Sequence, residues 1–72
     1  MEKQTFELRN NEEFVALNKI LKIKQIAQTG GHAKLLIEDR LVSVNGEIES
    51  RIRRKMRKGD LISVEGIEIE IV

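Results

Sequence analysis

The chain has 72 residues, about half the length of a common domain, so it has room for one small hydrophobic core. We expect a single domain over residues 1–72. Because the chain has no cysteine and one histidine, disulfide bonds and the usual structural zinc sites are excluded, and we expect no metal or other cofactor. The sequence has no long apolar run and no signal-peptide pattern, which predicts a cytoplasmic protein with no membrane partner.

The net charge of +1 hides a separation of charge along the chain. Residues 19–58 contain eleven Lys or Arg against four acidic residues, whereas the two flanking segments contain two against eight. A basic face opposed by acidic ends is typical of nucleic-acid-binding proteins. A mixed, solvated surface is the alternative explanation of this distribution.

The first predicted elements are a short strand and a helix. Residues 5–9 alternate between polar and apolar side chains, as on a strand with one buried face. The helix is expected to begin after Asn10 or Asn11, whose side chains can cap its free amides. Lys19 and Lys22 lie on a face away from the core. The apolar residues recur at helical spacing and are expected to be buried: Phe14, Leu17, Ile20 and Leu21.

A second helix is predicted after a connector over residues 23–28, which Ile23 and Ile26 should anchor. Thr29 is expected to cap it, and its first turn contains two glycines. Glycine lowers helix propensity by roughly 1 kcal/mol, so the pair fits close approach of another group, and bare helix amides suit a phosphate. An ordinary turn between packed helices explains the same spacing. The inward-facing residues are predicted to be Ala33, Leu36 and Ile37.

The remaining elements are predicted to be short strands. Residues 41–49 alternate on either side of Asn45 and Gly46, which is a strong signal for a two-residue hairpin turn. A second turn at Gly59 precedes residues 61–71, which should form a closing hairpin with its acids in solvent. Its last strand is the one edge expected to be free for pairing. Two helices followed by short strands predict an α+β fold.

The segment RIRRKMRKGD, residues 51–60, places six basic side chains in eight positions. Its apolar residues are spaced four apart as on a helix, whereas four of its basic residues alternate as on an extended chain, and both conformations remain open. The segment lacks the large apolar face of a membrane-surface helix. Contact with phosphates is therefore favoured over contact with a membrane.

Recognition of a folded RNA or a duplex is favoured over recognition of a single strand. The only aromatic residues are Phe6 and Phe14, and both are expected to be buried, so no stacking platform for bases is predicted. His32 has no evident catalytic partner, and the chain is too short for a deep pocket. We therefore expect no enzymatic activity and no small-molecule substrate.

Five short motifs occur in an order that resembles the S-four RNA-binding domain, also called the alpha-L motif. They are Leu17-Asn18-Lys19, Ile26-Ala27 before Thr29, Ala33 with Leu36-Ile37, Val42 to Gly46, and Gly59-Asp60-Leu61-Ile62. The resemblance covers about residues 14–65. It extends to modules of pseudouridine synthases and bacterial tyrosyl-tRNA synthetases, and it is greatest for small stand-alone bacterial proteins of this type.

The resemblance implies two antiparallel helices packed on a small, mostly antiparallel sheet. It also implies that the helices and the following strand face RNA, and that the domain has no catalytic activity. Lys34 occupies the basic position common in the second helix, and Thr29 takes the place of the usual Ser. Gly30 and Gly31 stand where the family commonly has Arg. Backbone amides and residues 51–58 would have to replace that contact.

We therefore expect a non-catalytic monomer that docks electrostatically on structured RNA, either ribosomal or transfer RNA, in ribosome assembly, translation or RNA regulation. The predicted RNA-binding residues are Lys19, Lys22, Lys24, Thr29, Gly30, Gly31, Lys34, Arg51, Arg53, Arg54, Lys55, Arg57 and Lys58. A protein-interaction adaptor, whose basic face docks on an acidic partner, is the alternative.

Overall fold

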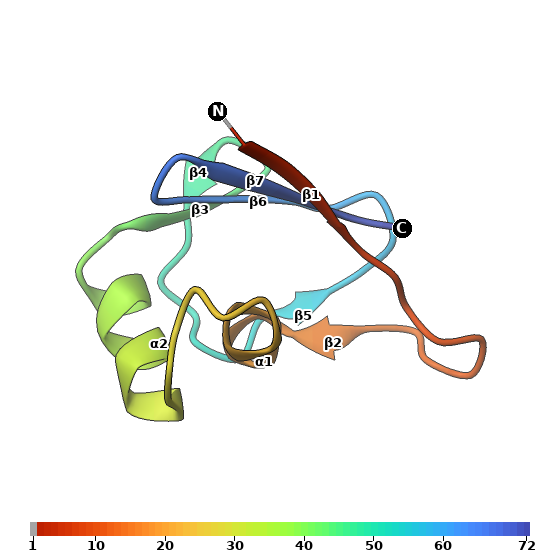
Figure 1. Ribbon diagram of the computed structural model, residues 1–72, viewed down its shortest axis with the longest axis horizontal. Helices are drawn as coiled ribbons and strands as arrows, with labels where there is room; N and C mark the ends of the chain where they lie inside the picture. The colour runs from red at the N-terminus through yellow and green to blue at the C-terminus, as the bar shows by residue number, and fades with distance from the viewer. Residues whose placement is uncertain (1) are drawn as a thin grey trace.

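A sheet forms one layer and two helices form the other in the computed structural model, which describes residues 2–72 (Figure 1). In chain order the elements are β1 (Glu2–Phe6), β2 (Val15–Ala16), α1 (Leu17–Ile23), α2 (Gly30–Glu38), β3 (Val42–Val44), β4 (Glu47–Ile48), β5 (Lys55–Met56), β6 (Leu61–Val64) and β7 (Ile67–Ile71). The main sheet has the order β1-β7-β6-β3-β4, and β2 pairs separately with β5. Only the β1–β7 pair is parallel among these strands, so the predicted α+β fold with a mostly antiparallel sheet is confirmed.

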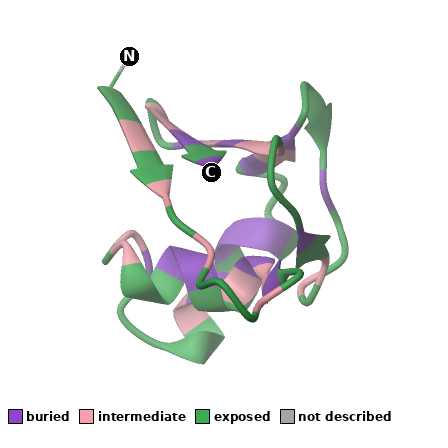
Figure 2. Ribbon diagram, turned by 90° about the vertical axis from the view of Figure 1, so that its right-hand side faces the viewer, coloured by how far each residue is buried: buried purple, intermediate pink, exposed green. Residues whose placement is uncertain are grey.

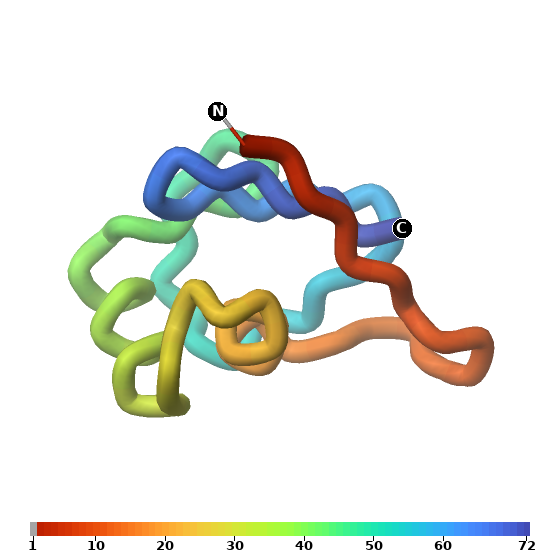
Figure 3. Tube along the Cα trace, viewed as in Figure 1, coloured from red at the N-terminus to blue at the C-terminus, as the bar shows by residue number. Residues whose placement is uncertain are grey.

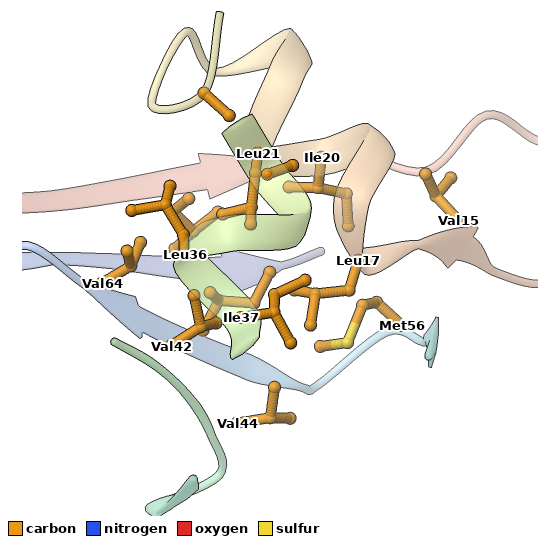
Figure 4. Close-up of a cluster of buried hydrophobic side chains, with 14 of the residues drawn as sticks. Val15, Leu17, Ile20, Leu21, Leu36, Ile37, Val42, Val44, Met56 and Val64 are labelled. Atoms are coloured by element: carbon orange, nitrogen blue, oxygen red, sulfur yellow. The ribbon is translucent and has the colours of Figure 1, made fainter. Parts of the chain in front are cut away.

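The hydrophobic core fills the space between the two layers (Figure 4). Figure 2 shows buried segments in both layers, with much of the turns and loops exposed. The largest fully buried side chains are Leu17, Ile20, Leu21, Ile37, Met56, Ile62, Ile69, Ile71, Val42 and Val44. Each buried Leu, Ile, Met or Val contributes about 1.5–3 kcal/mol, so this aliphatic cluster is the main source of stability.

Helix α2 begins at Gly30, as predicted, because Thr29 caps it. The Thr29 hydroxyl accepts a 3.0 Å hydrogen bond from the N–H of His32, which satisfies one of the free amides of the first turn. A Cβ added at Gly30 would meet nothing within 4 Å, and one at Gly31 would lie 3.8 Å from the Thr29 hydroxyl. Packing therefore does not explain the two glycines. The helix ends at Glu38, one residue after Ile37, the last residue of its buried face.

The prediction for the start of α1 is wrong. The helix begins at Leu17 and not after the two asparagines, because β2 lies in between and pairs with β5. The N–H of Leu17 donates to the carbonyl of Arg54 at 2.9 Å, and the N–H of Asn18 donates to the carbonyl of Ile52 at 3.2 Å. A distant loop thus satisfies amides that a local cap was expected to satisfy.

Two predicted core residues are exposed. Phe14 precedes β2 and is 39% exposed, because the helix that would have turned it inward starts only at Leu17. Ile23 ends α1 and is 52% exposed, so it does not anchor the connector. Ile26 and the buried Ala27 do so, since both pack on the core.

The edges of the main sheet also differ from the prediction. Strand β1 lies at Glu2–Phe6, not at residues 5–9, and it pairs in parallel with β7 along its whole length. Figure 3 shows the first segment of the chain lying beside the last. Because β1 covers β7, the free edges are β1 and β4, and the closing strand is not the edge that was expected.

Both predicted hairpins are confirmed. Asn45 and Gly46 have φ values of 53° and 87°, the left-handed conformation that a tight two-residue turn between twisted strands requires. The Asn45 side chain also accepts a 2.9 Å hydrogen bond from the N–H of Leu61 and donates a 3.0 Å bond to the Asp60 carboxylate. This turn therefore also fixes the start of β6. A second two-residue turn joins β6 to β7.

Candidate nucleic-acid interface

Residues 51–58, the basic segment, form neither one helix nor one strand. The chain leaves the sheet after β4, passes the N-terminus of α1 and then forms β5 (Figure 3). Met56 of β5 is fully buried and anchors the segment, while most of its basic side chains are exposed. Ile48, which a helix would have aligned with Met56, is 60% exposed. The prediction of an extended chain with alternating side chains is thus correct only for the residues around β5.

Glu49 organises the first half of the basic segment from a buried position. Its side chain is 6% exposed, and its carboxylate accepts hydrogen bonds from the backbone N–H of Arg51 at 2.9 Å and from the Arg51 guanidinium at 3.2 Å. The Arg54 guanidinium donates a further bond of 2.6 Å. Burial tends to raise the pKa of Glu49, but the hydrogen bonds from the two arginines outweigh it and lower the pKa from 4.5 to about 2. The carboxylate is therefore ionised at any physiological pH.

Four basic side chains line one shallow groove on the surface, here called the basic groove: Arg51, Arg53, Arg54 and Lys55. Two of them are held by Glu49, with side-chain exposures of 71% for Arg51 and 28% for Arg54. Arg53 and Lys55 are exposed and form no ion pair with an acid among residues 2–72. One carboxylate is paired with two of the four cations, so the groove carries an excess of positive charge, and such a groove concentrates the field that attracts phosphates.

Phe14 lies next to Lys55 of the basic groove and next to Arg57, which does not line the groove. The Lys55 ammonium is 4.9 Å from the centre of the Phe14 ring, and the Arg57 guanidinium carbon is 5.6 Å from it. The position follows from the pairing of β2 with β5, which sets Val15 opposite Met56. The prediction that no aromatic ring is available at the surface is wrong, because Phe14 is exposed.

Two predicted RNA-binding residues lie among acids, away from the basic groove. Lys58 lines a separate hollow with Glu7, Glu12 and Glu13. Lys19 lines another hollow with Glu7 and Glu12. These acids offset the charge of both lysines, so the structure does not gather all the predicted basic residues on one surface.

The other predicted residues are carried by the helices and their caps, and none of them lines the basic groove. They are Lys22, Lys24, Thr29, Gly30, Gly31 and Lys34. The N-terminal end of α2, which contains its first turn, points away from the sheet (Figure 1). The amides of a first helical turn, here including those of Gly30 and Gly31, have no acceptor within the helix.

Sequence reasoning missed Glu49 and Phe14. Strand alternation placed Ile48 inward and Glu49 outward, the reverse of what is found. The only available signal for Glu49 was the position of arginines two and five residues after it. No local signal marked Phe14, whose exposure depends on the pairing between β2 and β5.

Other functional groups contribute little. The ring Nδ1 of His32 accepts a 3.2 Å hydrogen bond from the N–H of Gln28, so this residue supports the turn before α2. Within residues 2–72, no three His, Cys, Asp or Glu side chains are grouped so that they could bind a metal ion. Neither helix in this part of the chain has the length and apolarity that crossing a membrane requires.

Comparison with known proteins identifies the family. Residues 6–72 match the family described as S4 domain. The Bacillus subtilis protein named "Probable ribosome maturation protein RlbA" is 37% identical over 54 residues, which cover 75% of this chain and 76% of that protein. Escherichia coli YbcJ is 33% identical over 58 residues, 81% of this chain and 83% of YbcJ.

The solution structure of Escherichia coli YbcJ, described as revealing an alpha-L motif involved in RNA binding, is similar to this fold. The TM-score is 0.71, with 32% sequence identity, over 94% of this chain and 85% of the YbcJ chain. The family resemblance seen in the sequence motifs is thus confirmed by the whole chain and by its fold. The protein belongs to the S4 domain family.

Proposed function

We propose that this protein is a non-catalytic RNA-binding domain over residues 1–72 that docks on structured RNA through the basic groove. The observation that carries the proposal is the buried Glu49, which holds Arg51 and Arg54 in place beside the exposed Arg53 and Lys55. The description of the similar YbcJ structure as containing an RNA-binding motif supports it.

The geometry of the groove suits phosphate oxygens. Arginine presents planar donors that match the oxygens of a phosphate, and hydrogen bonds between charged groups are about twice as strong as neutral ones. Because Glu49 already fixes two of the guanidinium groups, binding orders fewer side chains than it would in a mobile loop. Contacts of this kind position an RNA without reading its sequence.

We propose ribosomal RNA as the target, ahead of transfer RNA, and maturation of the ribosome as the process. Support comes from the similar Bacillus subtilis protein, which is named for ribosome maturation. Folded ribosomal RNA offers the dense phosphate surfaces that a small basic groove can engage. This function places the protein in the cytoplasm and requires no cofactor.

Crosslinking in bacterial cells, followed by sequencing of the attached RNA, tests the proposal. The groove variant is Arg53→Gln with Lys55→Gln, and the matched control is Lys19→Gln with Lys58→Gln, which removes the same charge among the acids. We expect one region of ribosomal RNA to be enriched among the RNA crosslinked to the wild type and to the control. This enrichment should be lost with the groove variant. Recovery of crosslinked proteins with no RNA above background would instead support an adaptor that docks on an acidic protein.

A further inference from the structure

We infer that the basic groove and Phe14 together form a site for one unpaired nucleotide, whose phosphate lies in the groove and whose base lies against the Phe14 ring. The inference rests on the proposed RNA binding and adds the feature of the RNA that is recognised. Lys55 connects the two parts, since it lines the groove and its ammonium lies 4.9 Å from the ring centre.

The exposure of Phe14 is the first observation. The core is built from aliphatic side chains and Met56, and Phe14 is not part of it. The chain contains two Phe and no Trp or Tyr. Phe14 is 39% exposed, and its ring lies next to the charged groups of Lys55 and Arg57. An exposed ring that the core does not need is suited to contact with a ligand that has an aromatic face.

The cations around the ring are the second observation. Lys55 and Arg57 both lie within cation–π distance of Phe14, which keeps positive charge next to an apolar surface. A nucleotide has the complementary arrangement, with an aromatic base joined to an anionic phosphate. The Arg57 guanidinium is itself a plane on which a base can stack.

The rigidity of the site is the third observation. Phe14 comes directly before β2, and β2 pairs with β5, the strand that carries Lys55, so the pairing of the two strands keeps the ring close to Lys55. Glu49 holds Arg51 and Arg54, which line the same groove as Lys55. The distance between the place for the phosphate and the place for the base is thus set by the fold.

The base must be unpaired for this contact. Bases inside a helix are stacked on their neighbours and offer no free face, whereas bulged or looped-out bases stack on aromatic and arginine side chains. The site therefore predicts a preference for a duplex that is interrupted by an unpaired nucleotide, because phosphates alone are available in any duplex.

Binding to three synthetic RNA duplexes tests the inference. The first is fully paired, the second carries one additional unpaired adenosine, and the third carries an abasic nucleotide at that position. We expect the wild type to bind the second duplex roughly tenfold more tightly than the other two. Phe14→Leu should abolish this preference while its affinity for the paired duplex stays the same, and Phe14→Tyr should retain it.

The outcomes separate this site from the proposed function. Equal affinity of the wild type for all three duplexes overturns the nucleotide site and leaves RNA binding through phosphates intact. Failure to bind these duplexes and deproteinised ribosomal RNA overturns both. If circular dichroism shows that Phe14→Leu is unfolded, two measurements still test the nucleotide site. The first is the affinity of the wild type for the duplex with the unpaired adenosine against its affinity for the abasic duplex, and the second is the same pair of affinities for Phe14→Tyr.

Discussion

The Arg54 guanidinium donates a 2.6 Å hydrogen bond to the buried carboxylate of Glu49. Arg53, its neighbour in the chain, is exposed and makes no such bond within residues 2–72. Two adjacent arginines thus have different roles, because one completes a buried ion pair and the other faces solvent. A count of positive charges along the segment does not distinguish them.

Replacement of these two arginines should therefore have unequal effects on stability. We expect Arg54→Gln to lower the free energy of unfolding by about 1–3 kcal/mol, because it leaves Glu49 buried with one fewer donor. Arg53→Gln should change it by less than about 0.5 kcal/mol. Thermal unfolding measures both, with a difference of roughly 4–8 °C per kcal/mol in a domain of this size. Equal melting temperatures would show that the Glu49–Arg54 contact is not structural.

Stability should decrease in acid because of Glu49. Its pKa is lowered from 4.5 to about 2 in the folded protein, so the ionised carboxylate favours folding. This contribution is fully present above about pH 4.5 and is lost as the pH falls from there towards about 2. Urea unfolding of the wild type and Glu49→Gln measures it. We expect the variant to be less stable at about pH 6 and the difference to shrink at about pH 2.5; a difference that does not change with pH would argue against the ion pair.

The glycines of α2 should be dispensable for folding. A Cβ is accommodated at Gly30 and Gly31, so Ala at either position should raise the free energy of unfolding by about 0.4–1 kcal/mol. Gly46, with φ at 87°, is the contrasting control. Because an alanine is strained in this left-handed conformation, Gly46→Ala should lower the free energy of unfolding by about 1–2 kcal/mol.

The same Gly30→Ala and Gly31→Ala variants test the predicted contact between α2 amides and a phosphate. We expect them to bind deproteinised ribosomal RNA more weakly than the wild type despite their higher stability, because a methyl group would hold the phosphate away from the backbone. Fluorescence anisotropy measures the affinity. Unchanged affinity would remove the first turn of α2 from the interface.

The elements that sequence predicted well are those specified by neighbouring residues. Thr29 caps α2 with its own side chain, and Asn45-Gly46 can form its turn because of its conformational preference alone. The spacing of Ala33, Leu36 and Ile37 marked the buried face of α2 without reference to the rest of the chain. Local chemistry was sufficient in each case.

The elements that sequence did not predict depend on distant contacts. The start of α1 is set by carbonyls of Ile52 and Arg54, and β1 adds to β7 from the opposite end of the chain. The burial of Glu49 follows from its two arginine partners and could not be derived from alternation. The candidate site is built on these distant contacts, so its residue types were predictable and their grouping was not.

The dependence of RNA affinity on salt tests most directly whether the basic groove neutralises phosphates. With about four phosphates contacted, the logarithm of the association constant for deproteinised ribosomal RNA should fall against the logarithm of salt with a slope of about −3 to −4. We expect Arg53→Gln to reduce the steepness of this slope by about 1, while Lys58→Gln, which removes a charge that lies among acids, leaves it unchanged. A flat salt dependence, or the same slope for both variants, would contradict RNA docking through this groove.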